Sequence, residues 1–230
     1  MGMTDERSVA VWQVDLEACR KHVAAHLLLL SPDERGRANR FRLGVHREWF
    51  IACRAALRLI LGARLATRPD RLRFGYGPSG KPEIDSGATA LRFSVSHSHG
   101  LALIAVAGGF EVGIDIERPA PVLDWSPLSA WAFSHGERRE LAEAADKPRA
   151  FLRGWTRKEA VLKALGVGLS APLTELTVSL GREPDLITTL AEGGRPADWT
   201  LIDLSGKAFV AALAAWVPRA SVDLRVMDLA

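Results

Sequence analysis

The chain has 230 residues, of which 48% are hydrophobic and 25% are charged, and its formal net charge is +3. This composition is ordinary for globular proteins and excludes disorder over most of the chain. The longest strongly apolar stretch, residues 23–30, is far shorter than the ~20 residues of a membrane-spanning helix. We therefore expect one large domain or two small ones, with no membrane partner.

The cysteines and the N-terminal residues indicate in which cellular compartment the protein is expected. The two cysteines, Cys19 and Cys53, are far apart, so neither a zinc motif nor a disulfide framework is predicted. The N-terminal stretch contains Asp5 and Glu6 and lacks the apolar core of a secretion signal. We expect a reduced, cytoplasmic location. The small positive charge suits a phosphorylated ligand or an acidic protein and does not by itself indicate nucleic acid.

The first part of the chain begins with a strand pattern and continues with helices. Apolar and polar residues alternate over residues 9–14, which predicts a strand, and residues 16–30 have a helical pattern. Ser31, followed by Pro32 and two acidic residues, is typical of a helix start. One or two arginine-rich helices are expected from there to Gly62.

The middle of the chain predicts neighbouring strands. After the turn-rich residues 70–80, a strand is expected at residues 91–95 and a break at residues 96–100. An apolar run over residues 101–107, two glycines and an alternating pattern over residues 110–116 follow. These last two segments predict strands that pair as antiparallel neighbours.

The remaining segments predict helices and then strands. Helical patterns cover residues 125–165 and end at Gly166. The tail has four strand-like segments, of which the third is alanine-rich and also compatible with a helix: residues 173–180, 199–204, 209–216 and 222–226. The order of elements indicates an α+β fold with two similar halves, which we divide into residues 1–110 and 111–230.

Two carboxylates lie close together at the strand predicted near the start of the second half. Because side chains alternate along a strand, Asp115 and Glu117 share one face, about 6.5–7 Å apart, while apolar neighbours face a core. Oxygen ligands without nearby His or Cys favour Mg²⁺ over zinc. The alternative is a half-exposed strand with a polar outer face, although aspartate is depleted in strands.

A second candidate segment is the helix that carries Glu159 and Lys163. These residues are four positions apart and therefore share a helix face. They could form an exposed ion pair worth about 0.3–0.5 kcal/mol. Thr156 and Glu159 also have the spacing of a helix-capping box. The segment alone leaves structural and chemical roles open.

Two more segments contain residues that suit phosphate binding. Residues 75–82 resemble a nucleotide-binding P-loop, but Pro82 replaces the hydroxyl residue that this loop requires, so we reject that function. Lys81 could still meet a phosphate as a point charge. In residues 93–98, His97 stands between two serines, which fits phosphate binding better than serine hydrolysis. The alternatives are a plain surface turn and a structural histidine.

Taken together, these segments resemble the Sfp-type 4'-phosphopantetheinyl transferases, which activate carrier proteins of peptide and polyketide synthases. Five motifs between about residues 31 and 173 carry the resemblance, in family order and at family-like spacing. They are Gly-Lys-Pro at residues 80–82, Phe-x-x-Ser-His-Ser at 93–98, Gly-Ile-Asp-x-Glu at 113–117, Phe-Ser-x-x-Glu at 133–137 and Trp-Thr-x-Lys-Glu-Ala-x-x-Lys at 155–163. The resemblance implies a monomer with two α/β halves related by a pseudo-twofold axis, built of mostly antiparallel sheets with helices packed on them.

The resemblance also implies the roles of individual residues. Asp115, Glu117 and Glu159 would hold Mg²⁺, Lys163 would take part in catalysis, and either Glu159 or Glu137 would be the base. The residues implied to bind coenzyme A are Lys81, Ser96, His97, Lys158 and, for the adenosine 3'-phosphate, Arg37, with Arg47 or Arg54 as substitutes. The substitutes are needed because His46 stands where the family often has an aspartate.

The implied reaction transfers phosphopantetheine from coenzyme A to a serine of an apo acyl or peptidyl carrier protein and releases adenosine 3',5'-bisphosphate. Two other functions compete with it. A nucleic-acid-binding protein could use the five arginines of residues 35–47, with Trp49 and Phe50 as stacking platforms. A metal-dependent phosphodiesterase would hydrolyse coenzyme A without a carrier.

Overall fold

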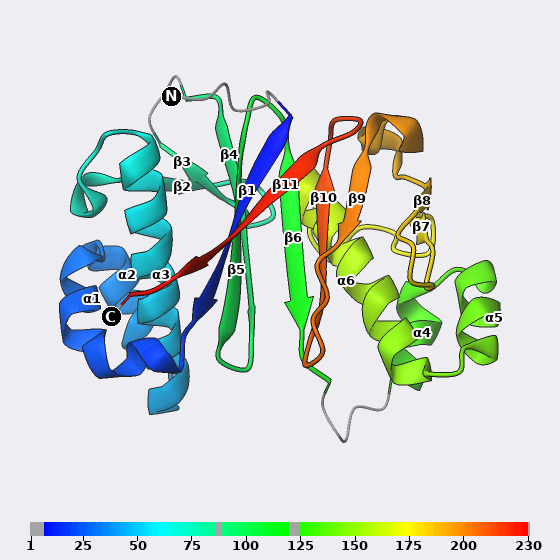
Figure 1. Cartoon of the computed structure of the whole chain (residues 1–230), viewed down its shortest axis with the longest axis horizontal. Coiled ribbons are helices and arrows are strands. Elements are labelled where there is room, and N and C mark those ends of the chain that lie inside the picture. Colours follow the sequence, from blue (N-terminus) through cyan, green and yellow to red (C-terminus); the bar gives the residue numbers. More distant parts are fainter. Residues whose placement is uncertain (1–6, 86–88, 120–124, 230) are drawn as a thin grey trace.

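The computed structural model describes residues 7–85, 89–119 and 125–229 (Figure 1). The predicted lack of a secretion signal in the first six residues lies outside this range. Two main sheets lie side by side, and a long helix covers the outer face of each (Figure 1). No helix in the described ranges is long and apolar enough to cross a membrane.

The first sheet has the strand order β11-β1-β5-β4, and the second has the order β6-β10-β9. The strands of the first are β1 Ser8–Asp15, β4 Leu91–Ser98, β5 Leu101–Gly108 and β11 Ser221–Met227. Those of the second are β6 Val112–Glu117, β9 Thr200–Asp203 and β10 Val210–Ala215. Two small hairpins join β2 Phe74–Tyr76 with β3 Pro82–Ile84, and β7 Thr177–Val178 with β8 Leu186–Thr188.

The helices lie outside the two sheets. Those of the first half are α1 Val23–Leu29, α2 Pro32–Ala38 and α3 Gly44–Arg64, and those of the second are α4 Ser126–Ala132, α5 His135–Glu143 and α6 Lys147–Leu165. Short 3-10 turns occur at Ala18–His22, Pro69–Arg71, Ala191–Gly193 and Pro196–Asp198. The predicted helix start at Ser31 is confirmed, because α2 begins at Pro32 and the Ser31 backbone N–H donates to the Glu34 carboxylate.

The core has three layers that follow from alternation along the strands. One cluster packs α3 on the first sheet, a second packs α6 on the second sheet, and a third lies between the two sheets. Strands β5 and β10 are buried on both faces and are therefore apolar throughout. In β10 the residues at this double interface are mostly alanine, which explains why its sequence is also compatible with a helix.

Several local predictions are wrong. Strands β5 and β6 do not pair: β1 and β4 occupy both edges of β5, and β6 pairs with β10. The predicted break at residues 96–100 is confined to the turn at His99 and Gly100, so β4 continues through Ser98. Of residues 173–180, only Thr177 and Val178 are in a strand.

The α+β class, the mostly antiparallel pairing and the packed helices are confirmed. The exception to antiparallel pairing among the described strands is β11, which runs parallel to β1. This C-terminal strand completes the sheet of the first half, so one strand crosses the division that we proposed at residue 110. The division itself stays a prediction.

Candidate active site

Three serine side chains connect the edge strands of the two sheets. Ser94, Ser96 and Ser98 occupy alternate positions of β4, beside β6. Their hydroxyl oxygens accept hydrogen bonds from the backbone N–H groups of Ile114, Ile116 and Arg118 at 3.1, 3.4 and 3.2 Å, respectively. Side chains thus replace the backbone ladder at the junction, and they fix the position of β6 relative to β4.

Two of these serines also hold the strand carboxylates. The Ser96 hydroxyl donates to Asp115 Oδ1 at 2.7 Å, and the Ser98 hydroxyl donates to Glu117 Oε2 at 2.9 Å. Asp115 is buried, and its Oδ2 has no hydrogen-bond partner within the described residues. Two carboxylates are therefore oriented in one direction by a polar strand edge.

Helix α6 brings the remaining charged groups to the same place. Lys163 Nζ donates to Asp115 Oδ1 at 2.6 Å and to the Ser96 hydroxyl at 3.1 Å. The helix lies against β6 so closely that a Cβ on Gly113 would lie 1.9 Å from the Ala160 carbonyl oxygen. A glycine in this strand is therefore what allows α6 to present Lys163 to Asp115.

A cavity of about 330 Å³ forms where these elements meet. Its lining residues are Val95, Ser96, His97, Asp115, Glu117, Trp155, Glu159 and Lys163. An adjoining cavity of about 250 Å³ shares Val95, Glu159 and Lys163 with it and also includes Lys81. Distant segments thus gather three carboxylates, a lysine and a histidine around one space.

The electrostatics of this cavity differ from those of an ordinary surface. Burial raises the pKa of Glu117, and the Asp115 charge raises it further. Burial also raises the pKa of Glu159, where Lys163 opposes the effect and the two strand carboxylates add to it. Desolvation and the Lys163 charge lower the pKa of His97. The carboxylates repel one another, so the site favours an additional positive charge.

The chemistry of the donor set fits a divalent cation. Three carboxylates face one cavity, and a buried Asp115 oxygen lacks a partner among the described residues. Hard oxygen donors of this kind suit Mg²⁺. The side chains do not converge on a common point, however, since no group of three or more His, Cys, Asp or Glu in the described ranges has metal-binding geometry. Lys163 instead contacts Asp115 directly.

Two residues predicted to act on the substrate have structural roles. Glu137 is 2% exposed, and its carboxylate accepts hydrogen bonds from the Ser134 and Val178 backbones and from Lys158. Lys158 is fully buried and also donates to the carbonyls of Ala132 and Leu173. Neither residue lines the cavity, so this arrangement lends no support to Glu137 as base or to Lys158 as a coenzyme contact, and both roles stay predictions.

The capping-box alternative for Glu159 is also wrong. Helix α6 begins at Lys147, so Thr156 lies in the helix interior, where its hydroxyl donates to the Leu152 carbonyl. The capping box in this region is formed by Ser134 and Glu137 at the start of α5. Glu159 is left free of a capping role and faces the cavity.

The basic residues predicted to meet coenzyme A differ in their availability. Lys81 Nζ donates to Glu111 at 2.7 Å and to the Ala164 carbonyl at 2.9 Å, so it bridges the two halves. Arg54 pairs with the buried Glu34, together with Arg58. The Lys81 and Arg54 side chains therefore already have partners within the protein, so they are less available to coenzyme A.

Two further arginines are less engaged. Arg47 makes one hydrogen bond of 3.4 Å to Asn39. Arg37 lies over the Phe50 ring, and its charge helps to lower the pKa of His97. Both guanidinium groups are therefore more available to a ligand than that of Arg54.

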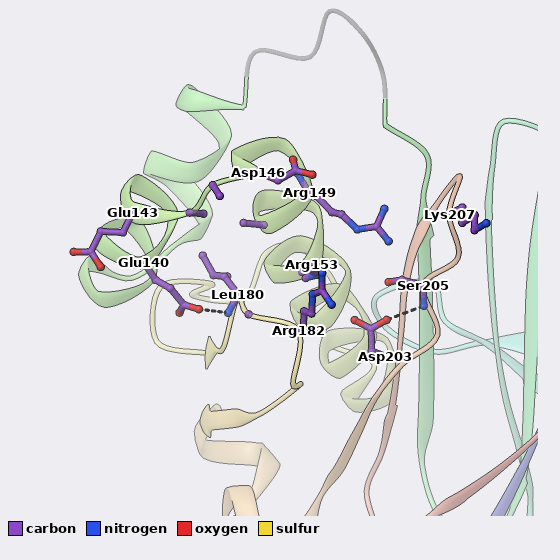
Figure 2. Close-up of a pocket in the computed structure, with 14 residues that line it drawn as sticks. Glu140, Glu143, Asp146, Arg149, Arg153, Leu180, Arg182, Asp203, Ser205 and Lys207 are labelled. Carbon is purple, nitrogen blue, oxygen red and sulfur yellow. Dashed lines mark hydrogen bonds between the residues drawn. The ribbon is translucent and has the colours of Figure 1, made fainter.

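A larger concavity, of about 940 Å³, lies at the opposite end of α6 (Figure 2). Its walls carry charges of both signs, and most of its carboxylates already have partners. Glu140 accepts a hydrogen bond from the Leu180 backbone, and Asp203 accepts one from Ser205 and pairs with the buried Arg157. None of the predicted site residues lines this concavity.

Comparison with known proteins identifies the family. Residues 111–214 match the family model of the 4'-phosphopantetheinyl transferase superfamily. The 4'-phosphopantetheinyl transferase HetI of Nostoc sp. is 37% identical over 207 residues, which cover 88% of this chain and 84% of HetI. The chain belongs to the 4'-phosphopantetheinyl transferase superfamily. The resemblance inferred from five motifs is thereby confirmed, and the protein is a phosphopantetheinyl transferase.

Other relatives match parts of this transferase. The 4'-phosphopantetheinyl transferase AcpT of Salmonella typhi is 37% identical over 127 residues, which cover 54% of this chain and 61% of AcpT. The crystal structure of Thermotoga maritima holo-(acyl-carrier-protein) synthase matches 47% of this chain and 64% of that chain, with 24% identity and a TM-score of 0.40. The segment matched by the family model contains Asp115, Glu117, Glu159 and Lys163, whereas Ser96 and His97 precede it.

Proposed function

We propose that this transferase moves the 4'-phosphopantetheine arm of coenzyme A to a serine of an apo acyl or peptidyl carrier domain. The serine oxygen forms a bond to the phosphorus on the pantetheine side. The bond from that phosphorus to the bridging oxygen breaks, and adenosine 3',5'-bisphosphate leaves. The observation that carries the proposal is the single cavity lined by Asp115, Glu117, Glu159 and Lys163.

Glu159 is the carboxylate best suited to accept the serine proton. Asp115 is bonded to Lys163 and Ser96, and Glu117 is bonded to Ser98. Glu159 lines the cavity and has no hydrogen bond or ion pair among the interactions found in the described ranges, so its carboxylate is available to accept a proton. The other predicted base, Glu137, has less support, because it is buried and bonded to Lys158.

The phosphates of coenzyme A would meet the basic side of the cavity. Phosphoryl transfer needs alignment and charge neutralisation more than covalent help from the protein. Lys163 lies at the cavity and supplies a fixed positive charge, and His97 and Ser96 line the same wall. Arg37, which acts electrostatically on His97, is the candidate contact of the adenosine 3'-phosphate.

We also propose that Asp115, Glu117 and Glu159 hold Mg²⁺ when coenzyme A is bound. A bound Mg²⁺ would neutralise developing charge on the pyrophosphate oxygens. The unpartnered Asp115 oxygen and the mutual repulsion of the carboxylates support this assignment. We further propose that the transferase acts as a monomer without a nucleic-acid or membrane partner. We also propose that it acts in the cytoplasm, where its two free and buried cysteines would stay reduced.

The competing functions have less support from the fold. Trp49 donates its indole N–H to Glu17 and stacks on His46, and Phe50 is buried in a core cluster. Neither ring is therefore a free platform for bases. A phosphodiesterase would use the same carboxylates, and it is distinguished by its product.

The test is incubation of wild type, Asp115→Ala and Glu159→Ala with coenzyme A, Mg²⁺ and an apo carrier protein, followed by mass spectrometry of the carrier. We expect wild type to add the phosphopantetheine mass, chelation by EDTA to stop the reaction, and both variants to be folded and inactive. Full modification by either variant would refute its assigned role. Hydrolysis of coenzyme A without modification of the carrier would favour the phosphodiesterase.

A further inference from the structure

An exposed tryptophan lies next to the cavity and has no role in the reaction proposed above. Trp131, on α4, is 50% exposed. Its ring packs against the ring of Trp155 on α6, with the centroids 6.4 Å apart and the planes tilted by 43°. Trp155 in turn lines the catalytic cavity. The two rings therefore form a continuous apolar surface from the cavity wall to the outside of the molecule.

The rest of α4 is uncharged. The helix, Ser126–Ala132, contains no charged residue, and Pro127 and Ala130 are exposed on it as well as Trp131. The helix is held against α6, since Lys158 Nζ of α6 donates to the Ala132 carbonyl. Figure 1 shows α4 lying beside the α6 helix. Interface cores are depleted of charge, as this helix is, and tryptophan is enriched in them.

The geometry of the reaction identifies the occupant of this surface. If the proposed function holds, the carrier serine must enter the cavity, so the carrier domain around that serine must cover the cavity mouth. A surface that begins at the cavity wall is then covered by carrier side chains. The groups suited to the phosphates of coenzyme A, Lys163, His97 and Arg37, all lie off α4, so these phosphates do not need Trp131.

We propose that Trp131, supported by Trp155, is the principal apolar contact between this transferase and its carrier domain. The contact requires an apolar patch next to the modified serine on the carrier. Large aromatic side chains at the centre of an interface commonly dominate its binding energy. Trp131 should therefore control the affinity for the carrier without affecting the chemical step.

The test compares wild type with Trp131→Ala and Trp131→Phe. Apo acyl and peptidyl carrier domains are the probes, and the domain that wild type modifies fastest is used for kinetics. We expect Trp131→Ala to raise KM for the carrier about tenfold. The kcat at saturating carrier and the KM for coenzyme A should stay within about twofold of wild type. Trp131→Phe, which keeps an aromatic ring, should recover most of the loss.

Leu224→Ala is the matched control. Leu224 is 55% exposed on β11, at the edge of the first sheet, so its truncation removes a similarly exposed apolar group far from α4 along the chain. It should leave KM for the carrier unchanged. An unchanged carrier KM in Trp131→Ala would overturn the proposal. So would a rise confined to the KM for coenzyme A, or a fall in kcat alone, because either result places Trp131 in coenzyme binding or in cavity support.

A direct binding measurement separates this proposal from the proposed function. Calorimetry with the apo carriers, in the absence of coenzyme A, needs no catalysis. A carrier that binds wild type and binds Trp131→Ala at least fivefold more weakly supports the docking surface even if no transfer occurs. Equal binding by both proteins, or no binding of any carrier to wild type, refutes the docking surface.

Discussion

Substituting Gly113 by alanine tests whether the close approach of β6 and α6 sets the active-site geometry. The added Cβ would lie 1.9 Å from the Ala160 carbonyl oxygen and 2.5 Å from the Ala164 backbone nitrogen. Real Cβ contacts are essentially never shorter than 3.0 Å, so strand and helix must separate by about 1 Å. Both clashing atoms belong to the helix backbone, so no side-chain rotation can relieve the contact.

The expected effect has two parts. Overpacking of this kind costs about 1–3 kcal/mol, which for a protein of this size lowers Tm by roughly 2–12 °C. The displacement also moves Lys163 away from Asp115, and a misplacement of about 1 Å can reduce a reaction rate ~100-fold. We therefore expect Gly113→Ala to lose far more transfer activity than its stability loss explains at 25 °C.

The measurement combines thermal unfolding followed by circular dichroism with initial rates of carrier modification, measured well below Tm. Gly136→Ala is the matched control, because a Cβ on this glycine of α5 would have its nearest neighbour, the Ser134 hydroxyl, at 3.9 Å. That variant should keep wild-type activity and stability. A Gly113→Ala protein with wild-type rate and Tm would show that α6 does not depend on this approach.

Two other predictions concern buried charge. Glu137→Gln leaves the fully buried Lys158 without its counter-charge and should lower the free energy of unfolding by about 3–5 kcal/mol in denaturant titrations, whereas Glu143→Gln on the same helix should change it little. For Glu34, burial opposes ionisation, but its two arginine partners outweigh burial and hold the pKa below its ordinary value of 4.5. Its contribution to stability is therefore complete above that value and is lost as the pH falls through the lowered pKa. The free energy of unfolding of wild type should fall in this acidic range by more than that of Glu34→Gln, and equal slopes would contradict the assignment.

Sequence reasoning located most of the cavity because its residues stand in short, spaced motifs. Alternation placed Asp115 and Glu117 on one face, and helical spacing placed Glu159 with Lys163. Both pairs line the same cavity. Neither segment alone predicts that the two pairs line one cavity, because this depends on how α6 packs on β6. That packing is possible because residue 113 is glycine and has no Cβ.

Some features of the molecule could not be obtained from motifs or local patterns. Glu137 and Lys158 belong to family motifs, but they bond to each other in the core, and a motif does not distinguish a buried ion pair from a catalytic one. The pairing of β5 with β6 was wrong because two adjacent strand patterns do not reveal that both edges of β5 are already taken. Trp131 escaped notice for the opposite reason, since nothing in its sequence context separates an exposed tryptophan from a core one.

The serine side chains of β4 explain why the Ser-His-Ser motif of residues 93–98 and the Asp-x-Glu motif of residues 113–117 lie side by side. Ser96 and Ser98 were expected to serve ligands, yet each hydroxyl also donates to a carboxylate of β6. Ser96 accepts the backbone N–H of Ile116 in β6, and Ser98 accepts that of Arg118, directly after β6. A hydroxyl can do both at once, because it has one proton and two acceptor sites. Alanine at position 96 or 98 would remove a hydrogen bond between the two sheets. It would also remove the hydroxyl that orients Asp115 or Glu117. The joint between the two sheets and the orientation of the active-site carboxylates are therefore a single structural feature, and a change that loosens one must disturb the other.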